Sequence, residues 1–182
     1  YEWIYKLPLN NKKAFKVLNK QRMTGIFQFE GNAVRNLAKQ MPIENMEDIA
    51  ALGALARPGP LATGGASQYV ARRSGKEKTT YMSNHPVVVK EIEGTYGIII
   101  YQEQVLRSAE ALAGFTPEQA DLLRRSITKA RNKKEFQAFA RRFVAQAVDR
   151  GVPKVKAQQV FKLLSQFAGY GFCKAHAATY AM

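Results

Sequence analysis

A ten-residue stretch, FAGYGFCKAH at positions 167–176, combines residue types that suit a nucleotide ligand. Two glycines flank Tyr170, and their backbone freedom allows a tight bend that presents this ring to a flat ligand. Lys174 and His176 follow closely and would meet the charged part of the same ligand. A base stacked on an aromatic ring, with cations beside the phosphates, is one way in which proteins bind nucleotides. The alternative is a glycine-rich elbow whose aromatic rings belong to the core.

A second candidate site lies in the strongly basic block from Arg124 to Arg150. The block contains nine basic residues and two acidic ones. A solvated helix face normally mixes the two signs along its length, so this block favours contact with phosphate groups over simple solubility. The residues predicted to contact DNA or phosphate, one of them from the separate RPGPL motif, are Arg57, Lys129, Arg131, Lys133 and Lys134.

Arg124 and Arg125 follow Asp121 by three and four residues, which is the spacing of stabilising ion pairs on a helix. One interpretation is therefore an ordinary structural ion pair. In the other, one arginine pairs with Asp121 while its neighbour faces a phosphate group, because the planar guanidinium meets two phosphate oxygens at once. Both interpretations stay open at the level of the residues.

The composition limits the class of protein. The chain has 182 residues, of which 46% are hydrophobic, and its formal net charge is +14. Such a length supports one domain with a real core, and the charge is typical of a protein that lies on a polyanion. The other reading is a basic protein whose charge serves solubility alone.

Cys173 is the only cysteine, so no internal disulfide forms and a reducing, cytoplasmic compartment is expected. Every apolar run is much shorter than the roughly 20 residues of a membrane span, so no membrane partner is expected.

Hydrophobic spacing predicts a mainly α-helical chain with a few short β-strands. Strands are predicted at 24–30 (TGIFQFE) and 94–101 (GTYGIIIY). Helix is not expected to run through 57–65 (RPGPLATGG), which forms either a rigid turn or a phosphate-binding nest. The predicted helices cover 12–20, 33–40 after an Asn32 cap, 45–56, 66–73, 85–91, 102–113, 117–129, 133–150 and 155–167.

The two ends of the sequence suggest a piece of a longer protein. Residues 1–10, which include Pro8, are expected to link an upstream domain to a domain at 11–182 that is truncated at its C-terminal end. Aspartate occurs only at positions 48, 121 and 149, and no carboxylates pair at metal-binding spacing. Chemistry that needs two metal ions would therefore take its ligands from elsewhere.

Five motifs, taken in order, resemble the fingers region of the C-family DNA polymerases, the bacterial replicative DNA polymerase III alpha subunits. They are TGIFQFE, ALARPGPL, TYGIIIYQEQV, ADLLRRSITK and FAGYGFCKAHAATYA. The similarity runs from about Leu7 to the last residue. The resemblance implies a multi-helix fingers domain that follows a palm, whose aspartates hold two magnesium ions. Those aspartates are absent from this chain, so the chain alone is expected to hold no cofactor and to be inactive.

The resemblance also implies roles for individual residues. Arg124 and Arg125 would contact the triphosphate of the incoming dNTP, and Tyr170 would pack beside its sugar and base. Lys174 and His176 would belong to the same pocket. The implied partners are dNTP, template-primer DNA, the other domains of the parent polymerase and, through absent regions, the sliding clamp and other replisome subunits. The implied setting is the cytoplasm of a bacterium or of a phage-infected bacterial cell.

Three departures from the family pattern indicate a divergent member. Cys173 stands where the family usually has asparagine, and the segment 62–78 is more basic than usual. TKARNKK follows the arginine pair in place of the usual GKKK and keeps the charge. An alternative function is a non-catalytic basic module that binds nucleic acid, and another is a purely structural helical domain.

Overall fold

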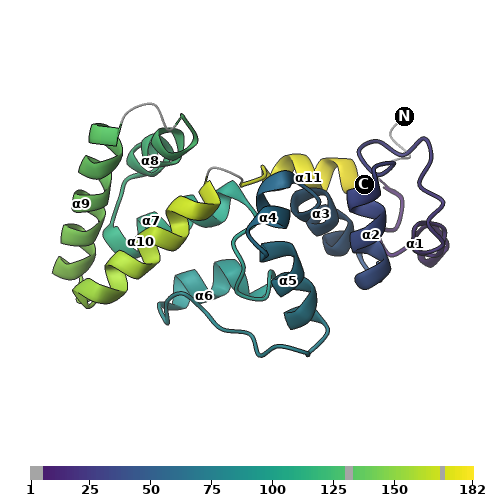
Figure 1. The fold of residues 1–182 in the computed structure, drawn as a ribbon, viewed down its shortest axis with the longest axis horizontal. Helices are drawn as coiled ribbons and strands as arrows, with labels where there is room; N and C mark the ends of the chain where they lie inside the picture. The colour runs from purple at the N-terminus through teal and green to yellow at the C-terminus, as the bar shows by residue number, and fades with distance from the viewer. Residues whose placement is uncertain (1–5, 130–132, 169–170) are drawn as a thin grey trace.

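The computed structural model describes residues 6–129, 133–168 and 171–182. This part of the chain folds into eleven helices joined by turns and short loops (Figure 1). The mainly α-helical fold class predicted from the sequence is therefore confirmed. The helices are α1 (Lys12–Asn19), α2 (Asn32–Gln40), α3 (Met46–Leu55), α4 (Pro58–Ala62), α5 (Gly65–Arg73), α6 (Pro86–Glu93), α7 (Gln102–Ala113), α8 (Pro117–Lys129), α9 (Lys133–Asp149), α10 (Lys154–Ala168) and α11 (Lys174–Ala181).

The buried side chains form two hydrophobic clusters. The first is built from α1, α2, α3 and α5, and from α11, which returns to it from the end of the chain. The second is built from α6, α7, α8, α9 and α10. Figure 1 shows α8, α9 and α10 at one end of the molecule and α1 and α2 at the other. The fold therefore has two cores, which we call the first and second core.

A short extended segment, Ile98 to Ile100, connects the two cores. Ile98 and Ile100 lie in the first core, whereas Ile99 between them lies in the second. Successive side chains of an extended backbone point in opposite directions. Three consecutive isoleucines can therefore anchor both cores at once.

Both predicted strands are wrong. Residues 24–30 form a series of turns, because the N–H groups of Ile26 and Phe29 donate to carbonyl groups three residues earlier. Gly97, with a φ of +75°, turns the chain within 94–101. The segment that follows is extended, and its single pairing with another described residue is a parallel bridge between Tyr101 and Phe172. The run of isoleucines at 98–100 therefore packs into two cores on opposite sides of the segment and does not form part of a sheet.

Most helix boundaries agree with the sequence prediction, with two corrections. Asn32 is the first residue of α2, and Gly31 occupies the N-cap position. The RPGPL motif contains the short helix α4, which was not expected there. Its two prolines lie in the first turn, where a backbone N–H has no partner within the helix. Asn45 caps α3, and at the start of α8 the Thr116 and Gln119 side chains each accept a hydrogen bond from the other residue's backbone N–H.

Two of the four basic residues in the 62–78 segment, Arg72 and Arg73, have structural partners. Arg72 is buried and donates to the carbonyl oxygens of Thr80 and Tyr96, while its Nε lies 2.9 Å from Glu77. Arg73 forms two hydrogen bonds to Asp48, at 2.9 and 3.0 Å. These arginines therefore fix α5 against its neighbours.

Candidate functional site

The arginine pair of α8 is organised around one carboxylate. Arg124 donates from Nε and Nη2 to Oδ1 of Asp121 at 2.9 and 2.8 Å, and Arg125 Nε lies 2.7 Å from Oδ2. The hydrogen bond from Arg124, assisted by the positive charges of both arginines, lowers the pKa of Asp121 below its usual value. The side chain of Arg125 remains 60% exposed, against 22% for Arg124. Both arginines therefore pair with Asp121, where the functional interpretation expected only one.

Several predicted phosphate contacts fall in or beside parts that are not described. Lys134 is exposed in the first turn of α9. Lys129 and Lys133 belong to the ends of α8 and α9, but their side chains lie outside the described residues, as does all of Arg131. Tyr170, the ring at the centre of the glycine-rich motif, also lies outside them.

The described part of the glycine-rich motif is held by the first residue of α7. Gln102 Nε2 donates to the carbonyl of Gly171 at 2.9 Å, and the backbone N–H of Gln102 donates to the carbonyl of Phe172 at 2.9 Å. Phe172 N–H in turn donates to Ile100 at 3.0 Å. A Cβ atom on Gly171 would lie 3.2–3.3 Å from atoms of Gln102. This close approach explains the choice of glycine.

Glu103 closes the N-terminus of α11 from the neighbouring helix. Both of its carboxylate oxygens accept from the backbone N–H of Lys174, at 3.0 and 3.1 Å, and Cys173 Sγ lies 3.6 Å away. A negative charge at a helix N-terminus interacts favourably with the helix dipole. The Gln102 and Glu103 side chains thus position and cap this junction.

Four rings in contact form an exposed row beside this junction, which we call the aromatic row. Phe172 lies 5.3 Å from His176, His176 lies 4.5 Å from Tyr180, and Tyr180 stacks on Phe27 at 4.5 Å between ring centroids. The guanidinium of Arg57 lies over Phe172, 4.8 Å from its centroid. Phe27 and Tyr180 are 58% and 55% exposed. The structure therefore brings Arg57 and His176 to one surface that is suited to stacking.

Three members of the aromatic row were not predicted as site residues from the sequence. Phe172 and Tyr180 stand four residues before and after His176, and this helical spacing is a signal that was available in the sequence. Phe27 gave no such signal, because it was assigned to a strand that does not form.

Lys174 points to a different environment from His176. Its Nζ lies 5.8 Å from the centroid of the Tyr101 ring. Lys174 and Tyr101 both line a pocket of about 330 Å³, together with Tyr69 and Glu47. Burial raises the pKa of both tyrosines, so they stay protonated at neutral pH.

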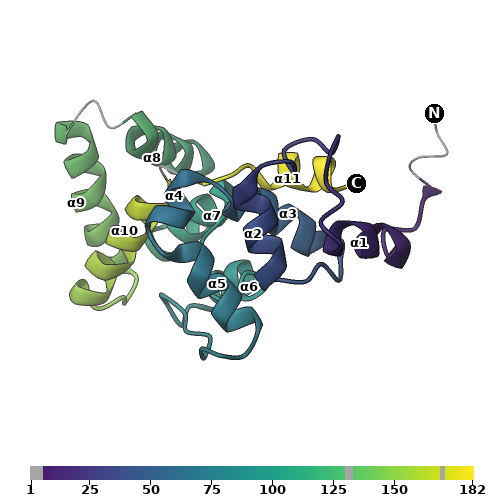
Figure 2. The same ribbon diagram turned by 45° about the vertical axis from the view of Figure 1, so that its right-hand side comes forward.

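The two candidate groups of residues lie on different cores. The arginine pair belongs to α8, which packs on α7, α9 and α10, while Lys174 and His176 belong to α11, which packs on α3. The first residues of α7 hold the start of α11 through Gln102 and Glu103. In Figures 1 and 2 both α8 and α11 follow the same upper edge of the molecule.

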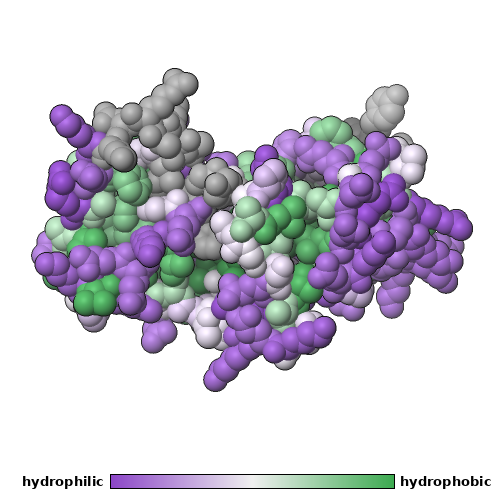
Figure 3. Space-filling view, viewed as in Figure 1, coloured by the Kyte–Doolittle hydropathy of each residue, from purple (hydrophilic) through white to green (hydrophobic). Residues whose placement is uncertain are grey.

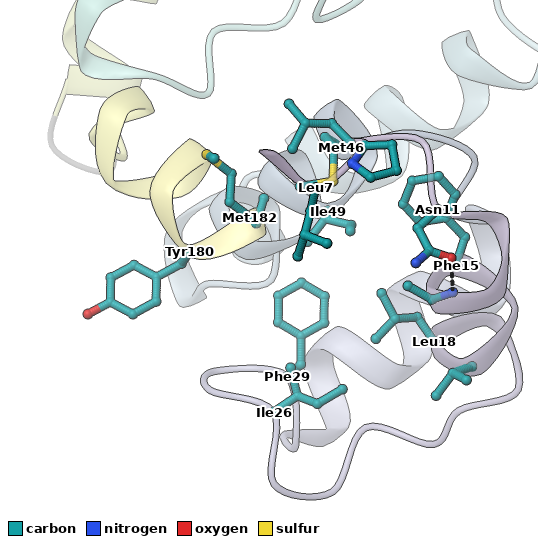
Figure 4. A pocket seen from close by; sticks show the side chains of 15 residues that line it. Leu7, Asn11, Phe15, Leu18, Ile26, Phe29, Met46, Ile49, Tyr180 and Met182 are labelled. Atoms are coloured by element: carbon teal, nitrogen blue, oxygen red, sulfur yellow. Dashed lines mark hydrogen bonds between the residues drawn. The ribbon is translucent and has the colours of Figure 1, made fainter. Parts of the chain in front are cut away.

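An apolar pocket of about 490 Å³ lies at the other end of α11. Figure 4 shows its lining from α1, from the turns at 24–30, from α3 and from the end of α11. Its walls include Leu7, Phe15, Phe29, Ile49 and Met182, and no charged side chain of the described residues lines it. The pocket therefore differs in character from the basic and aromatic surfaces.

The described residues contain neither a candidate metal cluster nor a helix that could span a membrane. No three His, Cys, Asp or Glu side chains among them lie close enough to share a metal ion. None of the described helices is both long and apolar enough to cross a membrane.

Comparison with known proteins connects these features to one family. Residues 3–151 match the model of the bacterial DNA polymerase III alpha subunit finger domain. The chain is 40% identical over 175 residues to the error-prone DNA polymerase of Symbiobacterium thermophilum, a match that covers 96% of this chain and 16% of that protein. It is 41% identical over 182 residues to the DNA polymerase III subunit alpha of Buchnera aphidicola from Schizaphis graminum, with coverages of 98% and 16%. The corresponding Escherichia coli K12 subunit is 39% identical over 180 residues, with coverages of 97% and 15%.

The chain thus spans about one sixth of the length of these relatives. The match to the family model extends over most of the chain and includes the arginine pair, the RPGPL motif and the first residues of α7. The chain therefore belongs to the bacterial DNA polymerase III alpha subunit finger domain family.

Proposed function

We propose that this chain is the fingers part of a DNA-directed DNA polymerase of the replicative type, and that it binds the incoming dNTP and template-primer DNA during templated 5′–3′ synthesis. The main support is the arginine pair, which gathers two guanidinium groups around a single carboxylate inside a matched family region. Together with Asp121, the two arginines carry a net charge of +1, and Arg125 is exposed to solvent. Such an arrangement attracts a phosphate group without leaving either cation unsupported.

The phosphate side of the proposed dNTP site is Arg124 and Arg125. Asp121 holds both guanidinium groups near each other, so little side-chain entropy is lost when a triphosphate binds. Arg125 is the more exposed of the two and has donors available for a second partner. We assign it the larger share of the contact with the triphosphate.

The base and sugar side comprises Tyr170, Lys174 and His176. His176 contacts Phe172 on one side and Tyr180 on the other, so its ring has a fixed place in the aromatic row. A ring held in this way offers an edge or face to a nucleotide without first being ordered. Arg57, Lys129, Arg131, Lys133 and Lys134 are the proposed contacts with the DNA backbone.

The chemical step is assigned to the remainder of a parent polymerase. Two-metal nucleotidyl transfer needs a cluster of carboxylates, and the described residues of this chain do not offer one. Magnesium would be held by aspartates outside this chain, and the chain alone would be inactive. The proposed partners are the other domains of that parent and, through them, the sliding clamp and replisome. The proposed location is the cytoplasm of a bacterial or phage-infected cell.

The decisive experiment replaces Arg125 with alanine in the full-length parent polymerase. Loss of one triphosphate contact should raise KM for dNTP or lower kcat by a factor on the order of ten or more. Arg107→Ala is the matched control, because Arg107 is also exposed and also pairs along its helix, with Glu110 at 3.1 Å. Steady-state primer extension measures both variants. Equal kinetics for Arg125→Ala and the unmodified enzyme would remove the arginine from the site.

The alternative function, a basic module that binds nucleic acid without catalysis, is favoured by the net charge of +14 alone. On either view DNA binding should weaken steeply with salt. Only a polymerase fingers domain should show competition between dNTP and DNA. Titration of dNTP into a complex of the chain with labelled DNA separates the two functions.

A further inference from the structure

Helix α1 carries a dense and one-sided group of lysines. Between Lys6 and Phe29 the sequence contains six basic residues and no acidic one. Four of them, Lys12, Lys13, Lys16 and Lys20, lie on α1 or at its C-cap, and all four are exposed. Hydrophilic side chains gather in Figure 3 at the end of the molecule where Figure 1 places α1 and α2. We call these four lysines the α1 basic face.

The geometry of the helix places the four lysines on one side. At about 100° per residue, positions 12, 13, 16 and 20 fall within an arc of roughly 100°. Phe15 and Leu18, which are buried in the first core, occupy the opposite side. Between the first and the last lysine the helix rises by about 12 Å. The α1 basic face is therefore a straight, solvent-facing stripe of positive charge.

In the isolated domain, the charges of this stripe destabilise helix α1. Lys12 and Lys13 occupy the first two positions of α1, where the helix dipole disfavours a cation. Lys12 and Lys16, and likewise Lys16 and Lys20, are four residues apart, and such like-charge pairs destabilise a helix by about 0.2–0.5 kcal/mol each. None of these lysines forms an ion pair or a side-chain hydrogen bond with any described residue. A face that served only solubility would not need this repulsion, since alternating charges solvate a helix equally well.

We propose that the α1 basic face binds the phosphate backbone of DNA at a site separate from the dNTP site, an inference that rests on the proposed function in DNA synthesis. A length of about 12 Å corresponds to roughly three to four phosphates of one strand. The stripe contains lysines and no aromatic ring, so it recognises charge and not base sequence. Binding to a polyanion removes the repulsion among the four lysines. The first part of the domain thereby gains its own contact with DNA, on a helix that carries no part of the dNTP site.

The test compares two triple variants that remove the same charge. The first is Lys12→Gln, Lys13→Gln and Lys16→Gln, and the control is Lys76→Gln, Lys78→Gln and Lys162→Gln, all exposed lysines on other segments. Fluorescence anisotropy of a labelled 20-base-pair duplex measures the dissociation constant of the 182-residue chain between 50 and 200 mM salt. If each of the three lysines neutralises one phosphate, the salt slope should fall by about 2.7 in the first variant. The slope of the control should change by less than 1.

A charge-conserving variant checks that the effect is electrostatic. Lys12→Arg, Lys13→Arg and Lys16→Arg should keep the salt slope of the unmodified chain, because the number of cations is unchanged. Glutamine and lysine have similar helix propensities, and the thermal midpoint of the glutamine variant should be equal to or above that of the unmodified chain as the repulsion is relieved. Equal slopes for the α1 variant and its control would overturn the proposal, since net charge alone would then explain the binding.

Failure of this proposal is distinguishable from failure of the proposed function. Competition by dNTP reports on the arginine pair and the aromatic row, and the α1 glutamine variant should retain it. If dNTP never competes but the salt slopes differ as expected, the α1 site stands and the polymerase function falls. If dNTP competes and the slopes do not differ, the α1 site falls alone.

Discussion

Asp121 determines how the two arginines of α8 are presented. Without this carboxylate, adjacent guanidinium groups would repel each other and point apart, whereas the two short pairs hold them on one side of the helix. Asp121 therefore acts by positioning Arg124 and Arg125, and it needs no contact with a ligand of its own. The spacing of these three residues was visible in the sequence, but the sequence left open whether one arginine or both would pair.

The acid titration of Asp121 tests this positioning role. Because the folded-state pKa of Asp121 is depressed, the pair contributes stability above the ordinary aspartate pKa of about 3.9. That contribution is lost as the pH falls through the lower, folded-state pKa. A carboxyl-detected NMR titration should therefore give a midpoint below about 3.9 in the unmodified chain. Arg124→Ala should raise it, because the hydrogen bond from Arg124 is the main cause of the shift. A midpoint that does not respond to this substitution would contradict the assignment.

Among the elements, most helices could be predicted, with α4 as an exception, and the two predicted strands were wrong. Capping residues such as Asn45 and Thr116 act within one turn of the helix that they begin, so a local sequence contains the whole signal. The alternation in Ile98–Ile100 is equally local, but its meaning depends on what lies on either side. Alternation with a period of two indicates that successive side chains point to opposite sides of an extended segment. It does not indicate whether each side packs against a strand or a helix.

The candidate site, too, could be predicted only in part from the sequence. The arginine pair, Lys174 and His176 were identified from residue types and motifs. Their surroundings were not, because Glu103 and Gln102 reach the glycine-rich segment across about 70 residues of chain. No local pattern predicts a helix cap supplied from another helix. The role of Glu103 becomes evident only when α7 and α11 are seen together.

The turn after α6 gives a prediction at the scale of this element. Gly97 has a φ of +75°, and a Cβ atom there would overlap the carbonyl oxygen of Thr80, which Arg72 holds at 3.1 Å. Gly97→Ala should lower the free energy of unfolding by about 2 kcal/mol or more, through strain and through loss of the Arg72 contacts. Gly94→Ala is the control, because Gly94 has a φ of −65° and an added Cβ would meet nothing within 4 Å. Urea unfolding should show no comparable loss for the control. Similar losses for both variants would show that the turn tolerates a side chain as well as the helix end does.

At the scale of the whole molecule, two cores share few segments. They are joined by the three isoleucines, by the loop that contains the Arg72 contacts and by the return of the chain to α11. Each core has its own fully buried leucines, Leu52 in the first and Leu164 in the second. Local stability should therefore differ between the two halves of the fold.

Two matched substitutions measure this independence. Leu52→Ala and Leu164→Ala should each destabilise the protein by about 2–5 kcal/mol, since both side chains are fully buried. Native-state hydrogen exchange should show the larger acceleration in α2, α3 and α11 for the first variant. The second variant should affect mainly α7, α9 and α10. Uniform acceleration throughout both halves in either variant would show that the two cores unfold as one unit.

The bridge between Tyr101 and Phe172 also affects the order in which this region folds during synthesis. Closing a loop of about 70 residues costs on the order of 4 kcal/mol in chain entropy, so this pairing forms only after the second core is in place to shorten the distance. Ala177 of α11 belongs to the first core. A ribosome therefore makes most of that core before α11, and the growing chain carries an open apolar face on the first core until α11 has been made.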